Sequence, residues 1–437
     1  MGGSRDKIAA GMFERNMPRY NTYPTPAFFH EGVGAADFDA WTAALVPGTR
    51  IRLRLQVPYC RALCWFCACR TQALRREEEL DAYLAAMHAE IRRTAALLPA
   101  GVEVGALQFC GGTPTVLAPE ALLRLAGWLR AELPMAGDAG FEVATDPRTL
   151  DPARLDALAA AGVTAVMLGV TDFAPRVQRA SGRVQDAAET AAAVAGLRAR
   201  GIGTVGVDIV HGLPLQDRAS LAATLAAVLA LRPDRIVLAG YMHVPWMAKR
   251  QRMISEACLP DAEARLALRR TAADMIGAAG YLPGGADRFV RAPEAEVVMG
   301  AGLGQEPVVG IGVATISAFP QGYVQNTLRT ARYHVLVGAG LGAGERGVVL
   351  GLGDRIRGRA IRMLLRDFRI DLAALRAEYG DFVRVLTPGL ALAVARFGTL
   401  VERGEDALVI PQEGVILARA VARCFDAQWV SSARPEA

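Results

Sequence analysis

The sequence predicts an α/β fold: an open or partial (β/α)6 barrel, preceded by an N-terminal arm and followed by a helical, winged-helix-like domain. Apolar runs of strand length alternate six times with amphipathic helical patterns, and after about residue 330 the pattern changes to helices with one hairpin. The chain has 437 residues, of which 52% are hydrophobic, too many for one ordinary core. We therefore expect an arm over residues 1–50, a barrel over 51–330 and a helical cap over 331–437.

Composition and charge exclude several classes of protein. The net charge of +5 is modest for this length and argues against a dedicated nucleic-acid binder. No signal peptide is visible, and no run of about 18 unbroken apolar residues occurs, so we expect a cytoplasmic protein with no membrane span. Lys7 and Lys249 are the only lysines. A compositional bias explains the excess of arginine, although arginine also suits ligands that carry carboxylates.

The arm contains a segment with two prolines on either side of aromatic residues, from Pro18 to Thr25. Proline restricts both itself and the residue before it, so we expect an extended, packed segment here rather than a helix.

The barrel is predicted from six strand-like runs and five helical patterns between them. The strands are expected at Ile51–Val57, Val104–Cys110, Phe141–Thr145, Ala165–Val170, Thr204–Val210 and Arg235–Met242. The helices are expected at Leu80–Leu98, Pro119–Leu133, Pro152–Ala161, Asp186–Arg200 and Leu221–Leu231. In such folds the functional site lies at the carboxyl ends of the strands.

A cysteine-rich loop follows the first strand directly. It holds Cys60, Cys64, Cys67 and Cys69, four of the seven cysteines. Thiolates suit zinc or an iron–sulfur cluster. A structural zinc site normally needs a second, separated pair of ligands, and none is visible. Three thiolates of one loop can instead hold three irons of a [4Fe–4S] cube and leave the fourth iron open. A zinc knuckle or idle buried thiols remain the alternatives.

The spacing of Cys60, Cys64 and Cys67 is similar to the motif of radical S-adenosylmethionine (SAM) enzymes. Cys69 makes the loop resemble one branch, the oxygen-independent coproporphyrinogen III oxidase family, and the resemblance extends to Asp426. It implies a [4Fe–4S] cluster on Cys60, Cys64 and Cys67, with SAM as the second cofactor. Cys69 is not needed for the cube, and a relay of an electron or a proton is its expected catalytic role.

The second strand is followed by Gly111, Gly112 and Thr113, where paired glycines let the backbone approach a ligand closely. The run resembles the family's Gly-Gly-Gly-Thr-Pro-Thr, which holds the amino group of SAM. Its first glycine is Cys110 here.

Four further positions match cofactor-binding segments of the family. We expect the planar guanidinium group of Arg183 to bind a carboxylate of the cofactor through two hydrogen bonds. The alternative is that Arg183 is a solvated surface arginine. Asp208, near the end of the fifth strand, is placed to bind ribose hydroxyls. Met242 is the last residue of the predicted sixth strand, and Ile316 lies in a segment that matches the family near residues 310–317.

The chain departs from the family at several positions that face the cofactor or the substrate. The family has a glutamate at the position of Ala144. Glu142, two residues earlier, lies on the same face of the strand, because successive side chains of a strand alternate between its two faces. His211 replaces a tyrosine and is expected to be a core histidine or a proton donor. The remaining departures are Arg54, Gln56, Thr171 and the shortened segment from Val297 to Pro307.

The cap is expected to form a lid over the barrel mouth. We predict helices at Arg355–Arg369 and Leu386–Arg403, a hairpin of Leu408–Ile410 with Val415–Leu417, and a last helix through Cys424. Binding of DNA by this winged-helix-like unit is the disfavoured alternative on the modest charge.

Two functions of different class follow from the resemblance. In the first, SAM is cleaved to a 5′-deoxyadenosyl radical that takes hydrogen from propionates of coproporphyrinogen III. Loss of carbon dioxide and an electron then gives vinyl groups, twice, and protoporphyrinogen IX. This enzyme would need an unidentified one-electron donor, and we expect a monomer that binds a tetrapyrrole. In the second, a divergent paralogue binds cluster and tetrapyrrole without turnover, like haem-trafficking relatives.

Overall fold

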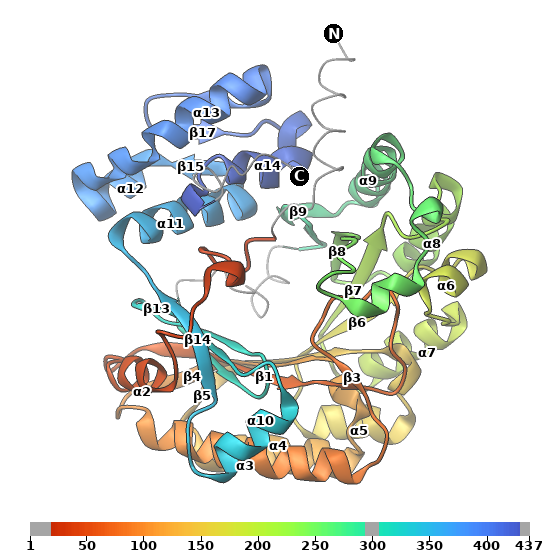
Figure 1. The fold of residues 1–437 in the computed structure, drawn as a ribbon. Coiled ribbons are helices and arrows are strands. Elements are labelled where there is room, and N and C mark those ends of the chain that lie inside the picture. Colours follow the sequence, from red (N-terminus) through yellow and green to blue (C-terminus); the bar gives the residue numbers. More distant parts are fainter. Residues whose placement is uncertain (1–18, 293–305, 429–437) are drawn as a thin grey trace.

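A computed structural model describes residues 19–292 and 306–428 of the chain. A twelve-stranded sheet curves around a central space, with helices on its outer face and the C-terminal domain across its open side (Figure 1). The six central strands are parallel and adjacent. They are β1 (Arg50–Val57), β4 (Glu103–Gly111), β5 (Met135–Thr145), β6 (Ala165–Thr171), β7 (Thr204–His211) and β8 (Arg235–Gly240). The six predicted strands and the α/β fold class are thus confirmed.

The alternation in β1 shows why these strands form. Ile51, Leu53, Leu55 and Val57 are fully buried against the outer helices, whereas the intervening residues are polar and face the barrel interior. A period of two is the pattern of a strand with two different environments on its faces.

All five predicted helices are present, within three residues of the expected bounds. They are α3 (Glu78–Leu97), α4 (Pro119–Glu132), α5 (Pro152–Ala160), α7 (Ala187–Ala199) and α8 (Arg218–Ala230). Two more, α6 (Pro175–Ser181) and α9 (Ala262–Ala278), were not predicted as full helices. Aspartates Asp151, Asp186, Asp217 and Asp261 cap the first turns of α5, α7, α8 and α9, each accepting a backbone N–H.

The sheet does not end near residue 330, where the boundary of the barrel was predicted. Beside β1 lie β11 (Val308–Ile311), β12 (Ile316–Ala318), β13 (Gly322–Asn326) and β14 (Gly344–Val349). Only β11 is parallel to β1. α10 (Thr330–Gly338) packs on α3. The other edge carries β10 (Arg288–Val290) and β9 (Leu282–Gly285). These strands are too short and too rich in glycine for their periodicity to be read.

The C-terminal domain begins at α11 (Leu352–Asp367), not at residue 331. It also contains α12 (Leu372–Tyr379), α13 (Thr387–Phe397), α14 (Ala418–Arg423) and a small sheet in the order β15 (Arg369–Asp371), β17 (Ala407–Val409), β16 (Glu402–Arg403). The predicted hairpin is wrong in its second strand, because residues 412–417 form a 3-10 helix after Pro411. The predicted helix to Arg403 ends at Phe397, because Gly398 has a φ of +53°.

The arm joins the two domains. It contains a 3-10 turn (Pro26–Phe28) and α2 (Ala35–Ala43), and Tyr20 and Tyr23 are buried in the core of the C-terminal domain. The Tyr20 hydroxyl donates to Asp426 at 3.0 Å. No helix forms from Arg19 to Thr25, as predicted, while Pro18 lies outside the described residues.

Candidate active site

The cysteine loop lies at the carboxyl end of β1, as predicted. Its two ends are joined by a short parallel pair, β2 (Tyr59–Cys60) and β3 (Gln72–Ala73). Gln72 N–H donates to the Pro58 carbonyl at 2.8 Å, and Leu74 N–H donates to the Cys60 carbonyl at 2.9 Å. The loop is therefore closed at its base, at the first cysteine.

Each of the four thiols has its own surroundings. The Thr113 hydroxyl lies 3.5 Å from the Cys60 sulfur, and an Arg183 N–H lies 3.5 Å from the Cys64 sulfur. Burial raises the pKa of Cys60. A hydrogen bond from Cys69 lowers the pKa of Cys67 to about 6, and the same contact raises the pKa of Cys69. Thiolate character is thus favoured at Cys67, which a metal ligand requires.

The donor set fits an iron–sulfur cluster better than a single ion. Within residues 19–292 and 306–428, no three His, Cys, Asp or Glu side chains converge closely enough to share one metal ion. Three soft thiols of one loop suit a cube, in which each sulfur binds a different iron. All seven cysteines are free thiols.

A second segment, the chain after β8, is hydrogen-bonded to the cysteine loop. Arg250 donates to the Thr71 hydroxyl at 2.8 Å and to the Thr71 carbonyl at 2.6 Å. Buried Gln251 donates to the Phe66 carbonyl at 2.8 Å and to the Met242 carbonyl at 3.0 Å. These bonds fix the cysteine loop against the chain that leaves β8.

Trp65 fixes the loop on its other side. Its N–H donates to the Ser181 carbonyl at 3.0 Å, and its ring lies over Gly182, where a Cβ atom would come within 2.6 Å of it. Gly182 also has a φ of +66° at the end of α6. Glycine is therefore required here by both conformation and space.

Gly111 and Gly112 lie against the base of the cysteine loop. A Cβ atom at Gly112 would lie 2.4 Å from the Tyr59 carbonyl oxygen, and Gly111 has a φ of +111°. Gly112 N–H donates to the Val57 carbonyl at 2.7 Å and Thr113 N–H to the Tyr59 carbonyl at 2.9 Å. The structure thus brings these predicted residues directly beside Cys60.

Arg183 is close to the cysteine loop but already engaged. Besides Cys64, it donates to Asp146 at 2.8 Å, to Gln185 at 2.7 Å and 3.1 Å, and to the Gly169 carbonyl. Burial would raise the pKa of Asp146, but the guanidinium groups of Arg148 and Arg183 outweigh it and lower that pKa. To bind a carboxylate of the cofactor, Arg183 would have to give up one of these hydrogen-bond partners.

The other predicted cofactor residues lie on different elements around the barrel. Asp208 is half-buried on β7, where burial and the charge of Glu142 raise its pKa to about 6. Met242 follows β8 and is tied to the loop through Gln251. Ile316 begins β12, paired with Gln325 on β13.

A buried polar layer crosses the barrel interior, and sequence reasoning missed it. Arg235 donates to the Glu142 carboxylate at 2.8 Å, with side chains 5% and 0% exposed. Gln108 donates to the other Glu142 oxygen at 3.3 Å and accepts from Arg54 at 2.9 Å. Both Glu142 oxygens therefore have partners within the protein, and Glu142 could bind a ligand in place of the glutamate absent at Ala144 only by exchanging one of them. The sequence signal for this polar layer is the presence of charged residues within otherwise apolar strands.

The remaining departures have structural explanations. The carbonyl of Gln56 accepts from the Tyr83 hydroxyl at 2.7 Å, and its side chain packs on Gly111. Thr171 is buried with a φ of +74° at a bulge of β6. Burial lowers the pKa of His211 to about 3, which favours a neutral imidazole and agrees with a core histidine. Of the segment from Val297 to Pro307, only Glu306 and Pro307 lie among the described residues.

Comparisons with known proteins agree with this geometry. Residues 57–226 match the model of the radical SAM superfamily. The chain is 40% identical to an oxygen-independent coproporphyrinogen III oxidase of Cereibacter sphaeroides, over 97% of both chains. It is 32% identical to that of Escherichia coli K12, over 95% of this chain and 94% of the other. The solved structure of coproporphyrinogen III oxidase from Escherichia coli, described as a radical SAM enzyme, has a TM-score of 0.87 at 30% identity, covering 94% of this chain and 97% of that chain.

Proposed function

This chain belongs to the oxygen-independent coproporphyrinogen III oxidase family of radical SAM enzymes, and we propose that it carries out the family's reaction. In that reaction two propionates of coproporphyrinogen III undergo oxidative decarboxylation to vinyl groups, which gives protoporphyrinogen IX. The observation that carries the proposal is the cysteine loop at the carboxyl end of β1, with Gly112 packed against its base. Nothing in the comparisons favours the alternative of a binding paralogue without turnover.

The cofactors of this enzyme are a [4Fe–4S] cluster and SAM. We propose that Cys60, Cys64 and Cys67 hold the cluster. For SAM we propose the set Gly111, Gly112, Thr113, Arg183, Asp208, Met242 and Ile316. When bound, the two groups together supply the one-electron chemistry that opens a carbon–sulfur bond of SAM and removes hydrogen from the substrate.

The chain's own residues position and shield this chemistry. The Arg250 and Gln251 contacts hold the cysteine loop in place, and Trp65 covers its inner side. The Arg183 guanidinium places a positive charge beside Cys64. Cys69, hydrogen-bonded to Cys67, is the proposed relay for an electron or a proton. Their contact raises the pKa of Cys69.

An anaerobic assay tests the proposal. The cluster is reconstituted, dithionite and SAM are added, and 5′-deoxyadenosine and protoporphyrinogen are measured with and without coproporphyrinogen III. We expect both products when substrate is present. Nucleoside without porphyrinogen turnover would keep radical chemistry and reject the substrate, and no nucleoside at all would reject the enzyme.

The electron donor is proposed to be an acidic one-electron carrier protein. The two segments 58–76 and 242–255 contain no aspartate or glutamate, and they carry Arg70, Lys249 and Arg252 on the surface. Trp246 and Met247, 66% and 68% exposed, lie among these cations. Apolar and basic groups beside a buried redox centre suit docking of an acidic partner, because charge complementarity raises the rate of association.

Charge reversal of this surface tests the donor. We expect the variant R70E/K249E/R252E to lose about tenfold or more in turnover with a reduced flavodoxin or ferredoxin at low salt. With dithionite, which needs no docking surface, turnover stays at the wild-type level. Equal loss with both donors would contradict the proposed surface.

We also propose a cytoplasmic enzyme that works as a monomer. The free thiols are typical of a reducing compartment, and every residue of the proposed site comes from one chain. One described stretch, Leu372–Leu400, is long and apolar enough to span a membrane by composition. It is divided among α12, a 3-10 segment and α13, with Gly380 at a φ of +59° between them. Leu375, Leu386 and Phe397 of this stretch are buried in the core of the C-terminal domain.

A further inference from the structure

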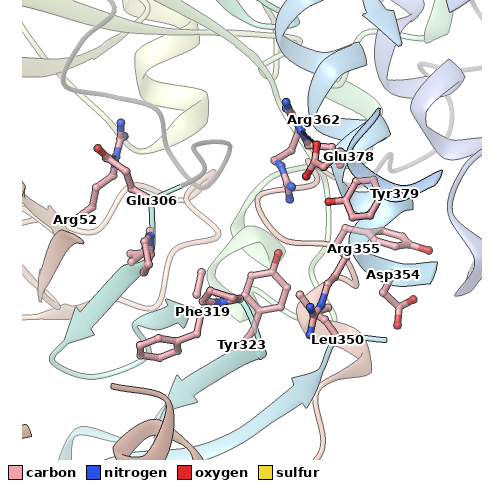
Figure 2. A pocket seen from close by; sticks show the side chains of 16 residues that line it. Arg52, Glu306, Phe319, Tyr323, Leu350, Asp354, Arg355, Arg362, Glu378 and Tyr379 are labelled. Carbon is pink, nitrogen blue, oxygen red and sulfur yellow. Dashed lines mark hydrogen bonds and ion pairs between the residues drawn. The ribbon is translucent and has the colours of Figure 1, made fainter. Parts of the chain in front are cut away.

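A second pocket lies toward the opposite end of β1 from the cysteine loop. Its volume is about 540 Å³, within the usual range of small-molecule sites. The amino end of β1 and the β11–β13 strands form one wall, and α11 and α12 form the other (Figure 2). Arg52 in this pocket is five residues before Val57, so it lies about 17 Å along the strand from the end that carries the cysteine loop. We name this second pocket the α11 pocket.

The α11 pocket contains more arginine than carboxylate. Arg52 pairs with Glu306 at 2.7 Å, and Arg359 lies 3.6 Å from Glu378. The third carboxylate, of Asp354, accepts a backbone N–H at the start of α11. The guanidinium groups of Arg355 and Arg362, two of the four in the pocket, therefore have no carboxylate partner among the residues that line it.

Arg355, Arg359 and Arg362 lie on one face of α11, because they are four and three residues apart. Among the described residues, neither Arg355 nor Arg362 forms an ion pair with a carboxylate, and Nε of Arg362 is buried without a hydrogen-bond partner. Burial also lowers the pKa of Arg362. A buried cation without a counterion is costly, so an anionic ligand lowers that cost at Arg362, whereas Arg355, on the same helix face, is exposed.

The remaining wall is aromatic and apolar. Phe319 and Tyr323 approach from the sheet, Tyr379 from α12, and Leu350 from the end of β14 (Figure 2). A ligand that matches both kinds of wall carries carboxylates on a broad apolar framework.

We propose that the α11 pocket holds the two propionate carboxylates that the reaction leaves on the tetrapyrrole, with Arg355 and Arg362 as their partners. This inference rests on the proposed function and deepens it. Two of the four propionates lose carbon dioxide near the cysteine loop, and two survive in the product. The distance along β1 between loop and pocket is comparable to the width of a tetrapyrrole with its propionate arms. When the two surviving propionates are held in this pocket, the two reacting propionates are turned toward the cluster.

Porphyrin binding to the full-length protein tests the inference. Stable coproporphyrin III, with four carboxylates, and protoporphyrin IX, with two, are titrated into wild type and into R355Q/R362Q by fluorescence. We expect the double variant to lose about tenfold to a hundredfold in affinity, since charge-assisted hydrogen bonds are lost. The loss should be equal for both porphyrins, because they share the carboxylates held here.

Two further variants control the result. Arg384 is an exposed arginine of the same domain, with its side chain 80% exposed, so R384Q should bind both porphyrins like wild type. R355Q/R362K keeps one charge but not its planar fork, and it should recover part of the affinity lost in R355Q/R362Q. Urea unfolding verifies that each variant is folded.

Two outcomes would overturn the inference. One is unchanged affinity in folded R355Q/R362Q. The other is a loss confined to coproporphyrin III, which would assign the pocket to the carboxylates that are removed. Nucleoside formation by the wild type is scored separately: its absence would reject the proposed function, while the porphyrin titrations would still decide whether the pocket binds carboxylates.

Discussion

Single residues in the barrel interior carry charges that water does not reach. Arg235 and Glu142 form an ion pair whose side chains are 5% and 0% exposed. Burial raises the pKa of Glu142, although Arg235 and Gln108 oppose that shift. Such a pair is stable only while both partners are present, because each alone would be an uncompensated buried charge.

Removing one partner of this pair should therefore destabilise the protein strongly. We expect E142A to lower the free energy of unfolding by about 3 kcal/mol, measured by urea denaturation of the anaerobic protein. The double variant E142L/R235M removes both charges and should recover most of this loss. An E142A protein as stable as wild type would show that the pair is not the main buried contact of Arg235.

His211 predicts how stability depends on pH. Its pKa is lowered to about 3 in the folded protein and is about 6.5 when unfolded, so between these values the unfolded chain binds more protons. Stability from this group is complete above pH 6.5 and is lost as the pH falls. From pH 7 to pH 5 we expect wild type to lose about 2 kcal/mol of stability relative to H211Q. Asp208, with its raised pKa, acts in the opposite direction in both proteins, so the difference between them isolates His211. Equal pH dependence of both proteins would contradict this expectation.

At the scale of elements, the segment after β8 determines the shape of the cysteine loop. Gln251 is fully buried, and besides its two carbonyl partners it accepts from the Val244 N–H at 2.6 Å. One side chain thus connects the loop, the β8 exit and its own 3-10 turn, Lys249–Met253.

Truncation of Gln251 should loosen the loop without unfolding the domain. It leaves three buried backbone groups without this partner, at a cost of about 1–3 kcal/mol each where water does not replace it. We expect Q251A to bind less iron per chain and to lose its visible absorbance faster in air than wild type. R252Q, an exposed neighbour on the same turn, should match wild type. Identical iron content and bleaching rates in Q251A would show that the loop is held by other contacts.

The parallel strands and their helices could be predicted from the sequence because each carries its own periodicity. Ile51 to Val57 alternate strictly, and Asp151 or Asp217 mark where a helix starts. The short strands β9 to β14 at the two edges of the sheet could not, because three- to six-residue strands such as Ile316–Ala318 are specified by their neighbours in the sheet. The cysteine loop was predicted from spacing alone. The partners of Arg183 and the α11 pocket were not, because they join residues that are distant in sequence.

At the scale of the whole molecule, the arm and the chain end hold the two domains together. The Tyr20 hydroxyl and the Asp426 carboxylate, 406 residues apart, are hydrogen-bonded, and the Ala427 N–H donates to the Tyr23 hydroxyl at 3.0 Å. Arg419 of α14 pairs with Asp287 between β9 and β10. Ala286 N–H donates to the Leu365 carbonyl at 2.8 Å.

Loss of the Tyr20 hydroxyl should weaken this connection. We expect Y20F to lower the free energy of unfolding by about 1–2 kcal/mol, because a buried hydrogen bond to a carboxylate is lost. Tyr379, only partly buried, gives the matched control, and Y379F should change stability by less than about 0.5 kcal/mol. Both are measured by urea unfolding. Equal effects of the two changes would show that the Tyr20 hydroxyl contributes no special stability.

The pairing of β1 with β11 also affects how the chain is made. Arg52 lies opposite Val308 in the sheet, so one neighbour of β1 leaves the ribosome 256 residues after it. At about 5–20 residues per second, that delay is about 13–50 s. Throughout this interval the nascent β1, which leads into the four thiols, lacks one of its two neighbouring strands. We therefore expect iron and sulfide to be inserted late in translation or after it, once β11 covers that edge.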